Sequence, residues 1–308
     1  MNPRPPDPAR GAAVVLAMLL AALAAAVAAT VFADQQRWSR TVEHRRDQVQ
    51  AQALALAGVQ WARQILYEDA QHSTIDHLRE PWAMALPAIP LDNGQVRGAI
   101  VDAQSRFNVN ALGDTGDRAN IERARIARLF AQRGGPVNAI DAIADWIDQD
   151  SIVRDGGAED AFYSARKTST LAANAPVLRV AELAEVKGVS TPMLAAVTPY
   201  LAALPASAPL NVNTASPEVL AAIVDNIGGE GLAKLIAVRA KTPFNTVAEF
   251  RAQLPQGTTL AGDETLSVKS DYFYVTIEAQ QGATLARARA LLRRRANAWP
   301  DVVWQTIE

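Results

Sequence analysis

The sequence predicts an α+β protein: a long N-terminal helix crosses a membrane and carries a head with an antiparallel sheet and a large inserted all-helical domain. Residues 12–33 contain no charged side chain, which predicts the membrane helix. The helical pattern then continues to about Tyr67 without a proline. Strand-like segments lie on both sides of a mainly helical block at 120–254, which predicts one sheet interrupted by an insertion.

The uncharged run at 12–33 is long enough to cross a bilayer. As a helix rising about 1.5 Å per residue it measures ~33 Å, which matches the hydrocarbon core. A cleaved secretory signal is the alternative, but its apolar core is usually about 7–15 residues long. Because the helical pattern continues past the run, one helix from Ala12 to Tyr67, on the order of 85 Å long, is expected. A membrane-anchored stalk explains that length, and a signal peptide does not.

Charges on the two sides of the run predict its orientation. Arg4 and Arg10 precede it against a single Asp7, while Asp34 follows it. Since positive residues tend to stay on the cytoplasmic side, the N-terminus is expected in the cytoplasm and the remaining ~275 residues across the membrane. The chain has no cysteine, which excludes disulfides and thiolate metal sites. Its net charge of −2 argues against a general polyanion binder.

Strand signals occur in two separate places. After a proline-interrupted stretch and a turn at 92–94, residues 95–102 and 106–109 are predicted to form two short strands. Beyond the helical block, 266–279 alternates like a strand with a kink near Ser270. Residues 283–295 have the composition of a helix but the alternation of a strand, and their arginines suggest a protected sheet edge.

An acidic cluster lies between residues 141 and 160. It holds seven carboxylates and one base, Arg154. The aspartates at 141, 145 and 148 would share a helix face, where like charges repel and some counter-charge is needed. The spacing of Asp148, Asp150 and Glu159 matches part of an EF-hand loop, but Ile152 and Val153 occupy positions where that loop needs a ligand and a glycine. From the residues alone, either a solvated acidic turn or a Ca²⁺ loop remains open.

Two segments, 185–197 and 225–236, have the pattern of helix-hairpin-helix units, which in some proteins contact DNA phosphates. The surrounding region 174–256 carries six basic and six acidic residues, so little phosphate affinity is expected. No catalytic motif is present, and the three histidines lie on or near the stalk, so an enzyme is not expected. The asparagines at 108, 110, 211 and 213 are expected to be structural, and Trp146 is expected in the core.

Several motifs resemble one family of secretion proteins. Arg10-Gly11 ahead of an apolar helix is similar to the leader of type IV pilins and pseudopilins. The segments VDAQSRFNVNAL at 101–112, DWIDQD at 145–150 with GAEDAFY at 157–163, and LNVNTA at 210–215 follow in order. Together they resemble general secretion pathway protein K, the large minor pseudopilin of type II secretion.

The resemblance implies how the chain is processed and divided. A peptidase would cut after Gly11, leaving Ala12 as a methylated first residue. The implied divisions are a leader at 1–11, a transmembrane helix at 12–33, the remaining stalk and linker at 34–94, an α/β pseudopilin head at 95–118 with 257–308, and an inserted helical domain at 119–256. Most pseudopilins carry glutamate at the fifth mature position, where it neutralises a neighbouring amine. Here Leu16 occupies it, which suits a subunit with nothing above it.

The resemblance also implies ligands, location and partners. Calcium would bind in the acidic loop, through Asp148, Asp150, Glu159 and Asp160, with Asp155 as a further candidate. The chain would be a single-pass inner-membrane protein with a periplasmic head. Its partners would be the I-type and J-type minor pseudopilins, forming a tip complex that primes pseudopilus assembly, with secreted proteins as further contacts. The apolar half of the stalk between Trp38 and Leu66 is the expected partner interface.

Two other classes of function compete with this interpretation. The first is a membrane-tethered helix-hairpin-helix protein that binds DNA in a competence-type uptake system. The balanced charge of that region speaks against it. The second is a membrane-anchored hydrolase, for which no catalytic constellation is present.

Overall fold

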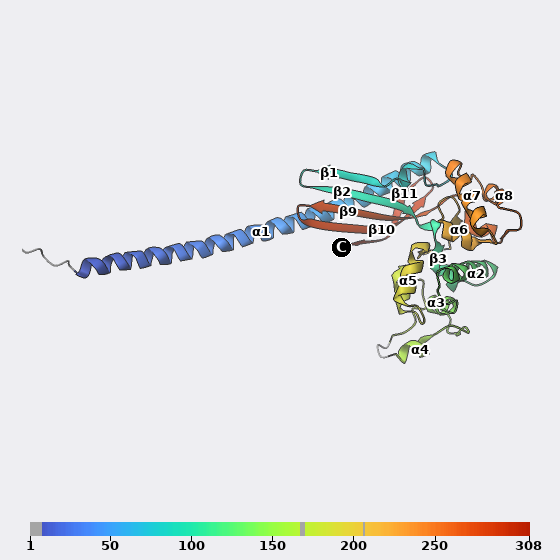
Figure 1. Ribbon diagram of the computed structural model, residues 1–308, viewed down its shortest axis with the longest axis horizontal. Coiled ribbons are helices and arrows are strands. Elements are labelled where there is room, and N and C mark those ends of the chain that lie inside the picture. Colours follow the sequence, from blue (N-terminus) through green and yellow to red (C-terminus); the bar gives the residue numbers. More distant parts are fainter. Residues whose placement is uncertain (1–7, 167–169, 206) are drawn as a thin grey trace, which may run out of the picture.

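A single helix, α1 (Pro8–His72), dominates the molecule. The computed structural model describes residues 8–166, 170–205 and 207–308, so residues 1–7 of the predicted leader lie outside the described part (Figure 1). The expected helix from Ala12 to Tyr67 is confirmed, extended by a few residues at each end. Figure 1 shows its first half projecting alone, while its second half lies against the head.

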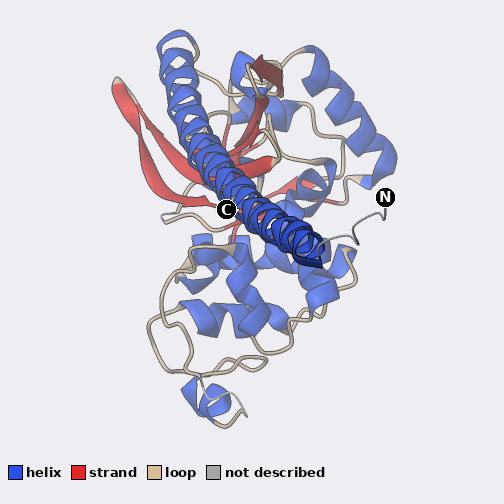
Figure 2. Ribbon diagram, turned by 90° about the vertical axis from the view of Figure 1, so that its left-hand side faces the viewer, coloured by secondary structure: helices blue, strands red, loops and turns tan. Residues whose placement is uncertain are grey.

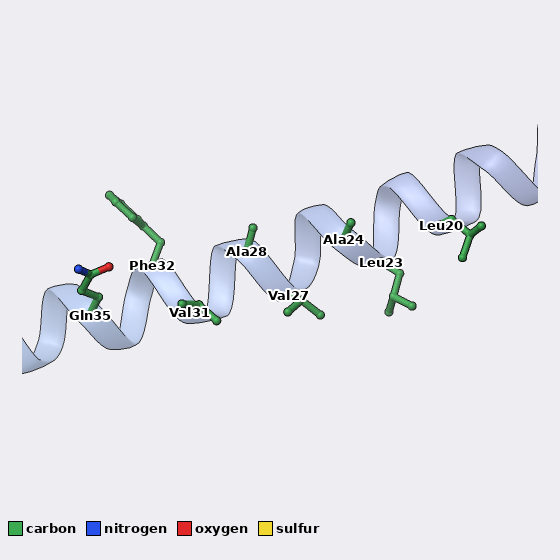
Figure 3. Close-up of a pocket in the computed structure, with 8 residues that line it drawn as sticks. All are labelled: Leu20, Leu23, Ala24, Val27, Ala28, Val31, Phe32 and Gln35. Atoms are coloured by element: carbon green, nitrogen blue, oxygen red, sulfur yellow. The ribbon is translucent and has the colours of Figure 1, made fainter.

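The projecting half of α1 is suited to a membrane. An 18-residue window near the N-terminus has a mean hydropathy of 2.7, and none of it is buried against the described part of the protein. Figure 3 shows eight residues of this stretch, from Leu20 to Gln35, with side chains that project from the helix and meet no other described element. An apolar helix left bare in this way is typical of a membrane span.

The second half of α1 packs on one five-stranded antiparallel sheet, seen along the stalk in Figure 2. Its strands, in spatial order, are β1 (Leu86–Leu91), β2 (Gly94–Asp102), β9 (Tyr272–Gln281), β10 (Thr284–Arg295) and β11 (Ala298–Ile307). The helix buries a stripe of small and medium side chains against it: Ala51, Ala55, Val59, Ala62 and Leu66. A Cβ at Gly58 would lie 2.6 Å from Ile277 Cγ2, so the close approach of helix and sheet requires glycine there.

The long-range pairing expected from the sequence is confirmed. β2 pairs with β9 over nine residue pairs, from Gly94↔Gln281 to Asp102↔Phe273. The helical block is therefore inserted into the sheet, as the predicted fold class requires. The predicted strand at 106–109 is much shorter, since β3 (Phe107–Asn108) pairs only with β4 (Leu201–Ala202) of the insertion.

Two expectations about the sheet were wrong. The sequence predicts that the prolines at 87 and 90 interrupt the chain, yet they lie within β1, an edge strand, where a missing N–H can face solvent. Residues 284–295 form β10, which lies between β9 and β11 rather than at an edge. Its arginines therefore do not protect an edge; Arg287 contacts Glu278 across the sheet, and Arg294 is buried. The edge strand on that side of the sheet is β11, which sequence reasoning had missed.

The insertion is mainly helical but contains short strands. Its helices are α2 (Asp117–Gln132), α3 (Ala139–Ile147), α4 (Asp160–Ser164), α5 (Thr191–Val197), α6 (Pro217–Ile223), α7 (Gly228–Lys241) and α8 (Val247–Ala252). β5 (Leu210–Asn211) pairs with β8 (Leu266–Ser267), and β6 (Val224–Asp225) pairs with β7 (Thr259–Leu260). The predicted strand at 266–279 is thus two strands, and residues 257–269, which the sequence assigns to the head, hydrogen-bond to the insertion.

Candidate metal centre

The acidic cluster forms around the end of α3. Asp145 lies on the last turn of that helix and is fully buried, and Asp148 follows the helix and is 6% exposed. The counter-charge that the sequence requires is Arg154, whose guanidinium donates to Asp145 Oδ1 at 2.6 Å and also to Asp148 Oδ2. The Arg154 N–H donates to Asp145 Oδ2 at 3.1 Å. Asp145 therefore has both oxygens satisfied and serves to hold the loop.

Three of the five predicted ligands come together beside this pair. Asp148, Asp150 and Glu159 each offer a carboxylate oxygen, and these oxygens all lie within 4.8 Å of one another. Asp155 is exposed, and Asp160 Oδ1 accepts the Ala172 N–H at 2.9 Å. Neither belongs to the three-carboxylate group of the described structure.

Arg154 is the cation paired with this group, through Asp148 Oδ2, and it leaves three buried carboxylate oxygens without a hydrogen-bond partner. Glu159 is 5% exposed, and neither of its oxygens has a hydrogen-bond partner; Asp148 Oδ1 also has none. Burial and, after it, the nearby charges of Asp145, Asp148, Asp150 and Asp160 together raise the pKa of Glu159 to about 7. Buried carboxylate oxygens are normally hydrogen-bonded, so these three oxygens are suited to a bound cation or a proton.

The loop that carries Glu159 is held in place by its backbone. The Gly156 N–H donates to Asp141 Oδ2 at 3.3 Å. Gly157 lies so close to the Asp145 carboxylate that a Cβ would collide with it. The Gly157 carbonyl accepts from Lys187 Nζ at 2.8 Å. Hard oxygen ligands on a loop fixed in this way suit Ca²⁺, which takes oxygen ligands in a flexible geometry.

The hairpin segments have roles within the fold. Gly188 and Gly228 have φ of +76° and +59°, as such hairpins require. Lys187, which precedes the first hairpin glycine, donates from its ammonium to the Gly157 carbonyl of the acidic loop. Arg239 is buried and donates to the carbonyls of Val212 and Ala215 at 2.9 and 2.6 Å. These two cations are therefore used in packing, and nothing in the described structure favours the DNA-binding alternative.

The four asparagines are structural, as expected, and form two matching turns. Asn108 and Asn211 each accept the N–H two residues later, at 3.2 and 2.9 Å. The side chain of Asn213 then pairs with both the N–H and the carbonyl of Phe244, at 2.9 Å each. Asn110 pairs in the same way with Val177. Trp146 is in the core, edge-on to Tyr163.

A second buried polar network joins the stalk, sheet and insertion, and sequence reasoning missed it. Asp102, at the end of β2, is 2% exposed, and burial raises its pKa to about 6. Its Oδ2 accepts from Thr214 and Ser270 hydroxyls at 2.5 and 2.6 Å and from the Asn211 amide at 3.1 Å. Its Oδ1 accepts the Gln104 N–H at 2.7 Å.

The same network continues to Arg294 of β10, which is 4% exposed. Its guanidinium contacts Asp69 Oδ2 at 2.5 Å and also Asp76 Oδ2. Burial, and then the neighbouring Glu80, raise the pKa of Asp69 to about 7 in spite of Arg294. The partners lie up to 225 residues apart in the chain, so no local pattern announces them.

These raised pKa values predict a pH dependence of stability. Glu159 and Asp69 have a pKa of about 7 and Asp102 of about 6, all above the value near 4 expected when unfolded. The folded protein then binds more protons than the unfolded one, and stability falls as pH rises through about 5 to 8. Metal-free protein should therefore melt at a higher temperature at pH 5.5 than at pH 7.5. Glu159→Gln should show a smaller difference, and an equal one would exclude Glu159 as a source.

Comparison with known proteins identifies the family. Sequence profiles of the family described as type II secretion system (T2SS), protein K, match residues 105–206 and 210–269. The type II secretion system protein K of Aeromonas hydrophila is 32% identical over 267 residues, which cover 80% of this chain and 81% of that protein.

The chain belongs to the type II secretion system protein K family. The protein K of Pseudomonas aeruginosa is also 32% identical, over 76% of this chain and 73% of its own. A chain in the crystal structure of the GspK-GspI-GspJ complex from enterotoxigenic Escherichia coli has the same fold, with a TM-score of 0.76 and 24% identity over 88% of this chain and 99% of that one. The predicted family and function, a minor pseudopilin of type II secretion, are confirmed, and protein K is a component of the secretion system anchored by its N-terminal helix.

Proposed function

We propose that this chain is a non-enzymatic subunit at the tip of the type II secretion pseudopilus, where it initiates assembly with I-type and J-type minor pseudopilins. The observation that carries the proposal is the α1 helix, which has no carboxylate between Ala12 and Ala33 and so offers none to a neighbour's amine above it in the membrane. A head much wider than the stalk also suits a terminal position (Figure 1). The solved GspK-GspI-GspJ complex, whose fold this chain shares, supports the choice of partners.

The proposal includes the location and processing of the chain. The bare apolar half of α1 would span the inner membrane once, with the N-terminus in the cytoplasm and the head in the periplasm. Cleavage after Gly11 would leave Ala12 as the first residue, within α1. Both statements are supported by the charges that flank the apolar run and by membership of the family.

The stalk segment expected to contact partners is partly buried in the head and partly exposed. Leu66 is fully buried against the sheet, so it belongs to the head's own core and not to a partner surface. Trp38, Val42 and Val49 are exposed by 70%, 45% and 66%, and their spacing places them on one side of α1. We assign the contact with neighbouring pseudopilin helices to these three residues, called here the stalk stripe.

The stalk stripe predicts a result in assembly. In full-length protein co-expressed with its I-type and J-type partners, Val49→Arg should reduce the amount of both partners that copurify by at least about tenfold, because a charge would be buried between helices. Gln36→Arg is the matched control, since it adds the same charge on a different face of α1. Equal copurification by the two variants would contradict this interface, and loss of protein secretion in Val49→Arg alone would support the tip function.

We also propose that the acidic loop binds structural Ca²⁺ through Asp148, Asp150 and Glu159. The three carboxylates converge, and three of their oxygens lack hydrogen bonds, which supports the assignment. When bound, the ion would neutralise the cluster. The hydrogen bonds of the Gly156 N–H with Asp141 and of the Gly157 carbonyl with Lys187 Nζ would hold the ligands in place.

This calcium site predicts a shift in thermal stability. With free Ca²⁺ at about 100 times the dissociation constant, the full-length protein in detergent should be stabilised by about 2.7 kcal/mol relative to chelated protein. The double variant Asp148→Asn, Glu159→Gln should show a smaller response, because it removes two of the three loop carboxylates. Asp155→Asn, a change at an exposed residue, should keep it. An unchanged response in the double variant would refute the assignment, and loss in Asp155→Asn would add Asp155 to the ligands.

A further inference from the structure

A second group of acidic residues lies at the far end of the stalk. Asp69 is on the last turn of α1, and Asp76 and Glu80 follow on the loop that leads to the sheet. Each offers a carboxylate oxygen, and the three oxygens lie within 4.8 Å of one another. Asp76 is 1% exposed and Glu80 6%. This group is separate from the acidic loop of the insertion.

The charges of this group do not balance. Three carboxylates face one guanidinium, that of Arg294, and this leaves a net charge of −2 in a buried site. The buried carboxylate of Asp102 lies close enough to Asp76 for their charges to interact, and it adds to the excess. Uncompensated charge is costly in the protein interior, so a positive partner is expected.

One oxygen of the group has no partner at all. Asp76 Oδ2 accepts the Ser270 N–H at 2.7 Å and contacts Arg294, whereas Asp76 Oδ1 is buried and makes no hydrogen bond. Glu80 Oε2 accepts from the His77 N–H and from Trp82 Nε1 at 2.8 and 2.9 Å. The hydrogen bonds therefore fix one oxygen of each side chain and leave a buried Asp76 oxygen available to a ligand.

We propose that Asp69, Asp76 and Glu80 bind one hard divalent cation, Ca²⁺, at the junction of the stalk with the head. Two oxygens that both contact Ca²⁺ at about 2.4 Å lie no more than about 4.8 Å apart, which is the spacing of this group. Three carboxylates, one guanidinium and one divalent cation sum to zero charge. The remaining coordination positions would be filled by water or carbonyl oxygens.

The position of this site gives the cation a structural role. Asp69 belongs to the stalk helix, and Arg294 belongs to the sheet. The Asp76 carbonyl accepts from the side chain of Asn211 in the insertion at 3.1 Å. A cation here would therefore hold stalk, sheet and insertion in one arrangement, independently of the loop at Glu159.

Equilibrium dialysis of the full-length protein in detergent micelles against Ca²⁺, followed by elemental analysis, tests the proposal. The protein used carries Asp148→Asn and Glu159→Gln, which disable the acidic loop. It should still retain about one Ca²⁺ per chain, and adding Asp76→Asn should remove it. No retained ion in the parent variant, or retention that Asp76→Asn does not change, would overturn the proposal. If the acidic loop of the wild-type protein binds no Ca²⁺, the number of ions retained by this variant does not change. The two sites are therefore tested separately.

Terbium luminescence supplies a second readout. Trp82 donates to Glu80, so Tb³⁺ in this site should be sensitised by that indole. In the Asp148→Asn, Glu159→Gln background, which disables the acidic loop, Tb³⁺ emission should persist and should disappear with Glu80→Gln. Because glutamine can still accept the two hydrogen bonds that Glu80 accepts, an unchanged circular dichroism spectrum is expected. Emission that survives in a folded Glu80→Gln protein would refute the assignment.

Discussion

Replacing Arg294 with methionine is expected to reduce the free energy of unfolding of the head by about 3–5 kcal/mol. Arg294 is 4% exposed and contacts both Asp69 and Asp76, so its loss leaves two carboxylates buried without their guanidinium. Methionine keeps much of the length of the side chain, which limits the packing loss. Urea denaturation of the full-length protein in detergent, followed by tryptophan fluorescence, measures the change.

The neighbouring residue is the matched control for this experiment. Arg295 also forms an ion pair, with Asp301 at 2.5 Å, but both side chains are about half exposed. Arg295→Met should therefore cost no more than about 1 kcal/mol. The loss in Arg294→Met should also shrink as pH falls below 7, because the pKa of Asp69 is already about 7 and protonation removes the uncompensated charge. Equal losses in the two variants would contradict the role given to Arg294.

Asp102→Ala is expected to have the second-largest effect, a loss of about 3–4 kcal/mol in the free energy of unfolding. The carboxylate accepts four hydrogen bonds, from Gln104, Thr214, Ser270 and Asn211. Alanine would leave the Gln104 N–H and the Ser270 hydroxyl without their acceptor, and each unsatisfied donor costs about 1–3 kcal/mol before relaxation. Since Thr214 and Asn211 belong to the insertion, its contact with β2 should also loosen.

Thr214→Val separates this loss of hydrogen bonds from a general defect at the junction. Valine keeps the shape of threonine and removes one of the four donors, so about 1 kcal/mol or less is expected. Limited proteolysis of the full-length protein provides the structural readout. Cleavage near residues 207–209, where the Pro209 carbonyl accepts from Gln104, should increase in Asp102→Ala and stay at the wild-type level in Thr214→Val. No increase in Asp102→Ala would show that the insertion does not depend on this carboxylate.

The acidic loop can be predicted only in part from the sequence. Asp148, Asp150 and Glu159 lie within twelve residues, so their convergence can be predicted from a single loop. What could not be predicted is that Asp145 is fully buried with Arg154, while Asp155 is exposed. Burial depends on the elements that cover a side chain. Here Gly157 lies against the Asp145 carboxylate and is itself held by Lys187, which lies further along the chain.

Elements whose signal is local can be predicted from the sequence. The uncharged run and its helical continuation specify α1, because helix formation depends on residues within a few turns. The alternation in 272–281 specifies β9, because one face must be buried.

Which segments lie next to one another depends on the tertiary structure. β10 is a central strand because β11 folds back onto it, and the prolines of β1 are accommodated because no strand covers its outer edge. The network of Asp69, Asp102 and Arg294 likewise exists only once three distant segments meet. Such contacts depend on the free energy of the whole packed arrangement, and the residues that make them carry no pattern in their own neighbourhood.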